Sequence, residues 1–428
     1  MTKQDTTIFR SAQGTFRSQG TRLMAACGAV LTLSATAALG GAPEYTIHEI
    51  GIVDAGDFGS QGFRVSSTGI ATGRSLGNVS QAFRWTEGGG LEPLPNLAGR
   101  DFAAGNGVNG AGVVVGTASL TSFGSGALPV IWTANTVQQL PLPNGFAVGR
   151  GNDINDDGIA VGSVGGGISE SAVIYGETTE IISASTGGGA TMTTAFSINN
   201  AGRVVGPGTD PANAARNVGL VYDSALDSIF EVGALPGANG AIAFGVSEAG
   251  HVVGASMQNQ GSGRPFIWSD AEGIQEIPLP SGTSQGSARG VNSDGWAVGT
   301  ASSAFAVPFL YDGSQTYRIA DLIPEGTGWD LDMNTSSSAL SINDDGVIVG
   351  TGVLNGNVRA YAMVPVGGDG CNAADLVEPF GVLDLADLQG FVAAFVSGDL
   401  SADIAEPTGV LDLADVQGFV AAFVAGCP

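Results

Sequence analysis

A nine-residue phrase recurs seven times along this chain and constrains its fold more than any other feature. Each copy has a branched apolar residue, usually an asparagine, two spacers, a glycine, three mostly apolar residues and a second glycine, as in Ile154–Gly162. The first glycines are Gly69, Gly112, Gly158, Gly202, Gly250, Gly295 and Gly346. They lie 43 to 51 residues apart, a period typical of β-propeller blades rather than of helical solenoids. We therefore predict an all-β fold, a seven-bladed β-propeller over residues 43–366.

Each phrase predicts a hairpin in which the first glycine takes a positive φ and the valine-rich run forms a buried strand. A third strand follows in each unit and usually ends in an aromatic residue, as in Phe83–Trp85. A fourth strand follows in six units. Examples are Leu91–Leu97, Val137–Leu142 and Ile274–Leu279, which contain Pro95, Pro141 and Pro278. Because proline cannot donate to a strand ladder, we expect this fourth strand at the outer edge of the blade.

The seventh unit ends after Val364 without a fourth strand of its own. A matching segment, Tyr45–Ile50, lies near the N-terminus and has the same pattern as Ser228–Val232. We expect Tyr45–Ile50 to complete the last blade, so that the ring closes without a covalent bond and leaves no long unpaired edge.

The net charge argues against two classes of partner, and the N-terminus indicates an exported protein. The net charge of −25 opposes binding to nucleic acid or anionic membranes. A basic lead is followed by an apolar run, Leu23–Leu39, with small residues at its end, as in a secretory signal peptide over residues 1–42. A retained anchor is the alternative. No later segment is long and apolar enough to span a bilayer, so we expect an extracellular or cell-surface location.

The C-terminal residues 371–428, after a short linker at 367–370, have a different character. The segment Ala374–Asp387 recurs 28 residues later as Ala402–Asp415, and each copy continues into an amphipathic helix. The tandem carboxylate-bearing loop and helix resemble a dockerin, in particular the Gly-Cys-type dockerin-like domain of secreted planctomycete proteins, which end as Gly426-Cys-Pro428 does here.

This resemblance implies two calcium sites, but the loops depart from the usual calcium pattern. With Gly381 and Gly409 at the sixth loop position, Leu376 and Ile404 occupy the first, where an oxygen ligand is expected. The candidate calcium ligands are Asp375, Glu378, Asp384, Asp387, Asp403, Glu406, Asp412 and Asp415. The alternative is a metal-free module in which these carboxylates interact with helix starts.

Two cysteines remain after removal of a leader, Cys371 before the first copy and Cys427 after the second. In an exported protein such a pair is more often a disulfide than a metal pair. We predict a disulfide that joins the ends of the module and contributes roughly 3–4 kcal/mol.

Other candidate sites are weaker. The run Asp153–Gly158 opens like a calcium loop, but its second half has no ligands, so we interpret it as a hairpin turn. The histidines, His48 and His251, form no catalytic motif. Repeated tryptophans could stack on sugars, but their matching repeat positions favour the blade core. We name no catalytic residue.

The propeller units also resemble the extracellular HAF repeat, and Ser80–Trp85 is the nearest match to its signature, with Gln81 in place of histidine. That family consists mainly of secreted bacterial repeats and implies no reaction. We expect a non-enzymatic propeller that binds a polysaccharide or protein ligand or joins a surface assembly, attached by its dockerin-like tail to a cohesin-like or other surface receptor. The alternative is a carbohydrate-active enzyme, because dockerins in other bacteria tether polysaccharide-degrading enzymes. Fold alone does not decide between them.

Overall fold

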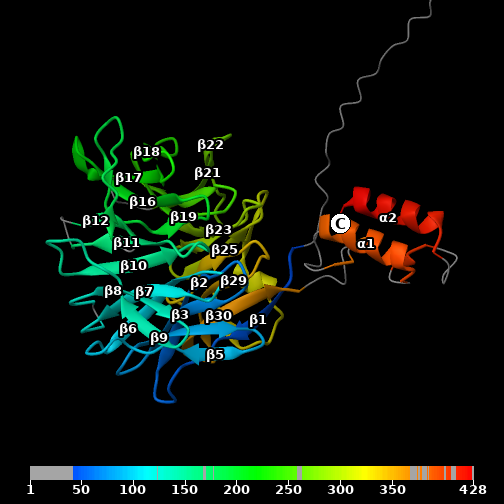
Figure 1. The fold of residues 1–428 in the computed structure, drawn as a ribbon, viewed down its shortest axis with the longest axis horizontal. Helices are drawn as coiled ribbons and strands as arrows, with labels where there is room; N and C mark the ends of the chain where they lie inside the picture. Colours follow the sequence, from blue (N-terminus) through cyan, green and yellow to red (C-terminus); the bar gives the residue numbers. More distant parts are fainter. Residues whose placement is uncertain are drawn as a thin grey trace, which may run out of the picture. The chain divides into compact units, whose positions relative to one another are not determined.

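A computed structural model of the chain shows the seven-bladed β-propeller that the repeats predict (Figure 1). It describes residues 42–122, 124–166, 170–176, 178–257, 263–366, 374, 376–377, 383, 385–399, 402–405 and 411–426. The signal peptide and the linker at 367–370 lie outside these residues, apart from Ala42. They remain predictions.

The seven sheets have four or five antiparallel strands each. The first three blades comprise β2 (Gly59–Val65), β3 (Ala71–Leu76), β4 (Gln81–Thr86), β5 (Gly90–Pro93); β6 (Phe102–Val108), β7 (Val114–Ser119), β8 (Leu128–Thr133), β9 (Thr136–Gln139); and β10 (Gly149–Ile154), β11 (Ala160–Val164), β12 (Ser171–Tyr175), β13 (Glu180–Ile181). The fourth and fifth comprise β14 (Thr191–Met192), β15 (Ser197–Ile198), β16 (Arg203–Asp210), β17 (Asn213–Asp223), β18 (Ser228–Glu231); and β19 (Gly240–Val246), β20 (Val252–Met257), β21 (Gly263–Ser269), β22 (Gly273–Glu276). The sixth comprises β23 (Gln285–Val291), β24 (Ala297–Ser302), β25 (Ala306–Tyr311), β26 (Thr316–Arg318), followed by the 3₁₀ helix η2 (Ile319–Leu322), and the seventh comprises β27 (Trp329–Asp330), β28 (Ser338–Ile342), β29 (Ile348–Leu354), β30 (Asn357–Pro365) and β1 (Tyr45–Glu49).

Both glycines of the phrase have a structural reason. The first lies in the turn with a positive φ, +80° at Gly158, which side chains with a Cβ rarely adopt. The second lies in the second strand of the blade, close to the backbone of the inner strand. A Cβ at Gly162 would come within 1.9 Å of the Arg150 carbonyl oxygen and 3.0 Å of the Tyr175 ring. This explains why an aromatic residue in the third strand accompanies the second glycine.

The N-terminal strand closes the ring, as predicted. Strand β1 pairs antiparallel with β30 from Tyr45 opposite Pro365 to Glu49 opposite Tyr361. Tyr45 is fully buried in the core of the last blade. Arg359 of β30 also donates to the Glu49 carboxylate at 2.9 Å.

The asparagine of the phrase ties neighbouring blades together. Its amide NH₂ donates to the backbone carbonyl of the corresponding turn residue in the next blade. The four described donors and acceptors are Asn109 to Asn155 (3.1 Å), Asn155 to Asn199 (3.2 Å), Asn199 to Ser247 (2.9 Å) and Asn343 to Ser66 (3.0 Å). The side-chain oxygen accepts the backbone N–H four residues later, at 2.9 Å for Asn155 and Ile159. In these four turns the asparagine therefore both stabilises the turn and bonds it to the next blade.

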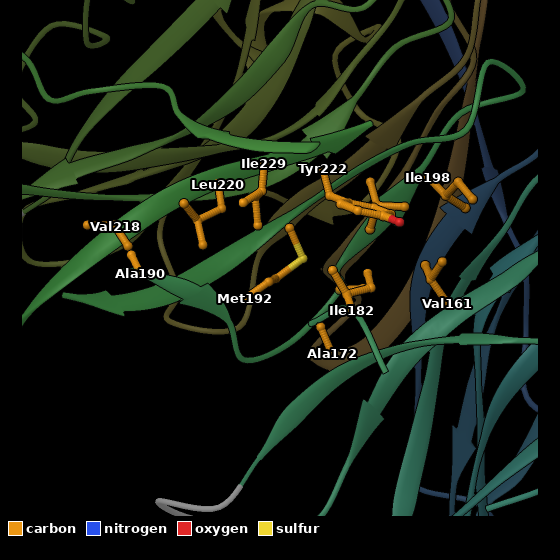
Figure 2. Close-up of a cluster of buried hydrophobic side chains, with 12 residues drawn as sticks. Val161, Ala172, Ile182, Ala190, Met192, Ile198, Val218, Leu220, Tyr222 and Ile229 are labelled. Atoms are coloured by element: carbon orange, nitrogen blue, oxygen red, sulfur yellow. The ribbon is translucent and has the colours of Figure 1, made fainter. Parts of the chain in front are cut away.

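The core consists of separate apolar clusters, several of which lie between adjacent blades. Figure 2 shows the cluster of the third and fourth blades, where Val161 and Ile182 meet Met192, Leu220 and Tyr222. Trp85 and Trp132 are buried in two other clusters, and Trp268 is half-buried in a further one. This confirms the interpretation of the tryptophans as core residues.

Three details differ from the expectation. The fourth strands are shorter than predicted, because their pairing ends at Leu94, Leu140 and Ile277, directly before Pro95, Pro141 and Pro278. The inner edge of the fourth blade is divided into β14 and β15. The last blade has an additional pairing of β27 with β29.

The C-terminal module contains the two predicted helices, α1 (Leu385–Ser397) and α2 (Leu413–Ala425). Phe391 and Phe419 stack between them with ring centroids 4.2 Å apart. Asp412 caps α2 by accepting the Ala414 N–H at 2.6 Å. No helix of the described residues has the length and apolar character needed to cross a membrane.

Candidate functional site

A β-bulge in six of the inner strands displaces one residue in the wall of the central channel. In β2, β6 and β10 the displaced residues are Phe63, Asn106 and Asn152. In β19, β23 and β28 they are Phe244, Arg289 and Leu340. Bulges often redirect side chains near binding sites. The register therefore places two asparagines, an arginine and apolar side chains at the same level of the ring.

A first cavity, of about 110 Å³, lies where the inner strands of all seven blades reach their hairpin turns. We call it the turn-side cavity. Arg64 of the first blade and Asp153 of the third form an ion pair in it. Asp153 also accepts hydrogen bonds from the Ser197 hydroxyl at 2.8 Å and the Ile198 N–H at 3.1 Å. This carboxylate is therefore held by structural partners on two other blades.

Three more carboxylates, Asp156, Glu248 and Asp344, line the turn-side cavity. Each accepts a backbone N–H from the preceding blade. The donors are Gly110 (2.6 Å), Asn200 (2.9 Å) and Ser293 (2.8 Å), respectively. No group of three or more histidine, cysteine or acidic residues in the described ranges is arranged to hold a metal ion.

The turn-side acids differ in their electrostatics. Burial, followed by the charges of neighbouring acids, raises the pKa of Glu248 despite the backbone hydrogen bond from Asn200. Burial also acts to raise the pKa of Asp156, but hydrogen bonds from Gly110, Asn200 and Ser67 outweigh burial and lower that pKa. The blade-to-blade bonds therefore favour the ionised form of Asp156.

A second cavity, of about 420 Å³, lies at the end of the first three blades remote from these turns. We call it the arginine cavity. Its walls contain Arg74 and Arg150, the bulge residues Phe63, Asn106 and Asn152, and also Phe102, Thr117, Ser80, Ser119 and Ser122. Among the described residues that line it there is no acidic residue, histidine or cysteine. The cavity thus offers cations, amides, hydroxyls and aromatic faces.

Within the described residues, the two arginines of this cavity lack carboxylate partners, in contrast to most of the other described arginines. Of the eleven arginines in the described residues, seven form ion pairs. The four that form none are Arg74, Arg100, Arg150 and Arg289. Arg100 donates instead to the Gly126 carbonyl at 2.7 Å. Two of the remaining three line one cavity, in a chain with 40 acidic residues.

The candidate calcium ligands of the C-terminal module are described only in part. Asp375, Glu378, Asp384 and Glu406 lie outside the described residues, as do Cys371 and Cys427. Asp403 is half-buried. Asp387 is buried and accepts the N–H groups of Leu376 and Val377 at 2.8 and 2.9 Å. Asp415 does the same for Ile404 and Ala405 at 3.0 and 2.9 Å.

Each of these two carboxylates therefore accepts hydrogen bonds from backbone N–H groups of the segment that precedes its helix. Hydrogen bonds from the N–H groups of Asp412 and Ala405 are the largest causes that lower the pKa of Asp415. Calcium binding and the disulfide remain predictions.

The sequence analysis considered Asp153 only as part of a turn and did not relate it to Arg64, although a signal for the pair exists. The position before the branched residue of each phrase reads Arg64, Gly107, Asp153, Ser197, Gly245, Gly290 and Ser341. Only two residues in this column are charged, and their charges are opposite. Because equivalent residues of a propeller lie around one channel, aligning the repeats would have indicated the pair.

No protein-family model matches the chain, and no curated protein matches it. Among solved structures, it is similar to a streptogramin B lyase (11% identity, TM-score 0.45, 74% of this chain and 98% of that one). It is similar to YCF48 bound to a D1 peptide (10%, 0.47, 77% and 98%). It is also similar to virginiamycin B lyase from Staphylococcus aureus (10%, 0.46, 76% and 100%). At these identities the likeness concerns the propeller fold alone.

Proposed function

We propose that this chain is an exported binding propeller of the HAF-repeat type, attached to a surface receptor through a dockerin-like C-terminal module. The observation that carries the proposal is the chemistry of the arginine cavity. Its amides, hydroxyls, guanidinium groups and aromatic faces suit the holding of a polar ligand. General acid–base catalysis commonly uses histidine or a carboxyl group, and the described residues that line the arginine cavity include neither.

The turn-side cavity supports the same proposal. A glycosidase needs a general acid and a second carboxylate on opposite sides of the scissile bond. Asp153 is held by Arg64, Ser197 and Ile198, and the other acids accept backbone N–H groups of neighbouring blades. These carboxylates hold the ring together, and the cavity of about 110 Å³ is small for a sugar chain.

The surface of the helices supports attachment through the tail. Val392 and Val396 on α1 are exposed, and so are Val420 and Val424 at the equivalent positions of α2. The two helices have nearly the same sequence, so each presents the same apolar face to a receptor. Exposed apolar groups of this kind mark protein interaction sites.

The experiment separates binding from catalysis. The purified protein is incubated with insoluble and soluble polysaccharides, and depletion from solution is measured together with release of reducing ends. We expect binding to at least one polysaccharide without release. Release above the protein-free blank would favour the carbohydrate-active enzyme, and absence of binding to all of them would exclude polysaccharide as the ligand class.

Attachment is tested by retention on the cell surface. Val392→Asp combined with Val420→Asp places charge on both helix faces, at side chains about half exposed (51% and 52%). We expect the protein to leave the cell fraction and accumulate in the medium while its circular dichroism stays unchanged. Gln389→Asp, at an exposed polar position of α1, is the matched control. Unchanged retention of the double variant would refute the role of these faces.

A further inference from the structure

We infer that the arginine cavity is a binding site for a small carboxylate-bearing, hydroxyl-rich molecule such as a uronic acid. This inference rests on the proposed binding function and names the ligand class. Three features carry it: two guanidinium groups without a counter-ion among the described residues, the amide and hydroxyl groups beside them, and the location at the end of the first three blades remote from the turns.

Arg74 supplies the first cation of the cavity. Among the described residues its guanidinium donates one hydrogen bond, from Nε to Gln61 Oε1 at 2.9 Å. Its Cζ lies 5.8 Å from the centroid of the Phe63 ring. The side chain is half-buried, and burial lowers its pKa. A guanidinium has five N–H donors, so this environment leaves most of them for a ligand.

Arg150 supplies the second cation. It lies on β10, at the position that Gln61 occupies on β2, and lines the same cavity. No hydrogen-bond acceptor is assigned to its guanidinium within the described chain, and the side chain is exposed. It therefore stands where an incoming ligand first meets the protein, while Arg74 lies deeper.

The charge of the whole chain makes this arrangement selective. With a net charge of −25, the surface repels anions in general. A carboxylate is drawn only to a place where local positive charge exceeds the background. Guanidinium groups bind carboxylates through two parallel N–H···O bonds, which are stronger than neutral hydrogen bonds.

The remaining walls indicate a ligand with hydroxyl groups. Asn106 and Asn152 each donate an amide hydrogen bond to a backbone carbonyl of the next blade, to Gly151 at 2.7 Å and to Ala195 at 2.8 Å, and the Asn106 amide also donates to the Thr117 hydroxyl oxygen at 3.2 Å. These bonds fix the amides in place before a ligand arrives. Thr117, Ser80 and Ser122 add hydroxyl groups to the wall, whereas the Ser119 hydroxyl donates to the Thr121 carbonyl at 2.9 Å. The volume of about 420 Å³ falls in the range of small-molecule pockets.

The test compares galacturonate with galactose, which has the same ring without the carboxylate. Isothermal titration calorimetry of the full protein should show galacturonate binding at least about tenfold more tightly than galactose, because a hydrogen bond to a charged group is stronger than one to a neutral group. The affinity should fall with added sodium chloride. Equal affinity for the two sugars, or no heat with galacturonate, would overturn the inference. Sulfate binding in place of galacturonate would overturn the carboxylate class.

Variants locate the site. Arg74→Gln and Arg150→Gln should each weaken galacturonate binding about tenfold or more. Arg264→Gln is the matched control, because Arg264 is paired with Glu276 at 2.8 Å and lies outside the cavity, so its affinity should equal that of the parent. Arg150→Gln alters an exposed side chain and keeps the test decisive if Arg74→Gln does not fold. Parent-like affinity in Arg150→Gln would refute the site, whatever the outcome of the polysaccharide assay.

Discussion

Replacing Asp153 with alanine should destabilise the propeller more than any surface charge change. The side chains of Asp153 and Arg64 are only 6% and 17% exposed. The substitution leaves the Arg64 guanidinium without its counter-ion and also removes the acceptor of the Ser197 hydroxyl and the Ile198 N–H. Removing one partner of a buried pair costs about 3–5 kcal/mol, and we expect a loss of unfolding free energy in that range.

The assay is equilibrium unfolding in guanidinium chloride, followed by tryptophan fluorescence. Glu276→Ala, which breaks an exposed ion pair with Arg264, is the control and should cost at most about 1 kcal/mol. The double variant Arg64→Met with Asp153→Leu removes both charges and should recover most of the loss. A cost below about 1 kcal/mol for Asp153→Ala would refute the structural role of this carboxylate.

Three further predictions concern the ring and the tail. Tyr45 Oη is buried and has no hydrogen-bond partner among the described residues, so Tyr45→Phe should leave thermal stability unchanged or raise it. Tyr361→Phe removes a hydrogen bond to the Ser338 carbonyl and should therefore cost about 1 kcal/mol. Deleting residues 43–53 removes β1 and should cost several kcal/mol or cause aggregation by exposing β30; a parent-like melting curve would contradict this. The pKa of Asp415 is lowered in the folded protein. The ionised Asp415 therefore contributes its full stabilisation above about pH 4, and this contribution is lost as the pH falls through the pKa of the folded state. Asp415→Asn should make the unfolding of the helices, measured by circular dichroism, less dependent on pH in this acid range.

The blade architecture could be predicted from the sequence because it is encoded seven times in local terms. A turn glycine, a buried strand and an aromatic third strand each follow from neighbouring residues, and even the displaced strand at Tyr45 was visible from what the last unit lacks. The strand ends at Pro95 and Pro141 were placed too late, because edge position alone does not restore the N–H that proline lacks.

The cavities were harder to predict, because their walls join residues from different blades. Arg64 and Asp153 lie 89 residues apart, and only an alignment of the repeats relates them, not a pattern within one repeat. Arg74 and Arg150 resemble ordinary strand arginines in the sequence. Their significance lies in the carboxylates that they do not contact, and this is a property of the assembled ring. The division of the fourth blade's inner edge likewise depends on tertiary packing.

The closing strand also fixes the order in which the ring can be completed. Glu49 and Arg359, which form an ion pair across β1 and β30, are separated by 310 residues. At about 5–20 residues per second, the first strand to be synthesised waits roughly 15–60 seconds for its partner. Until then Tyr45 lacks the core of the last blade into which it packs in the folded protein. A chain that terminates early in any blade would therefore lack β30 as well as that blade, so the ring could not close.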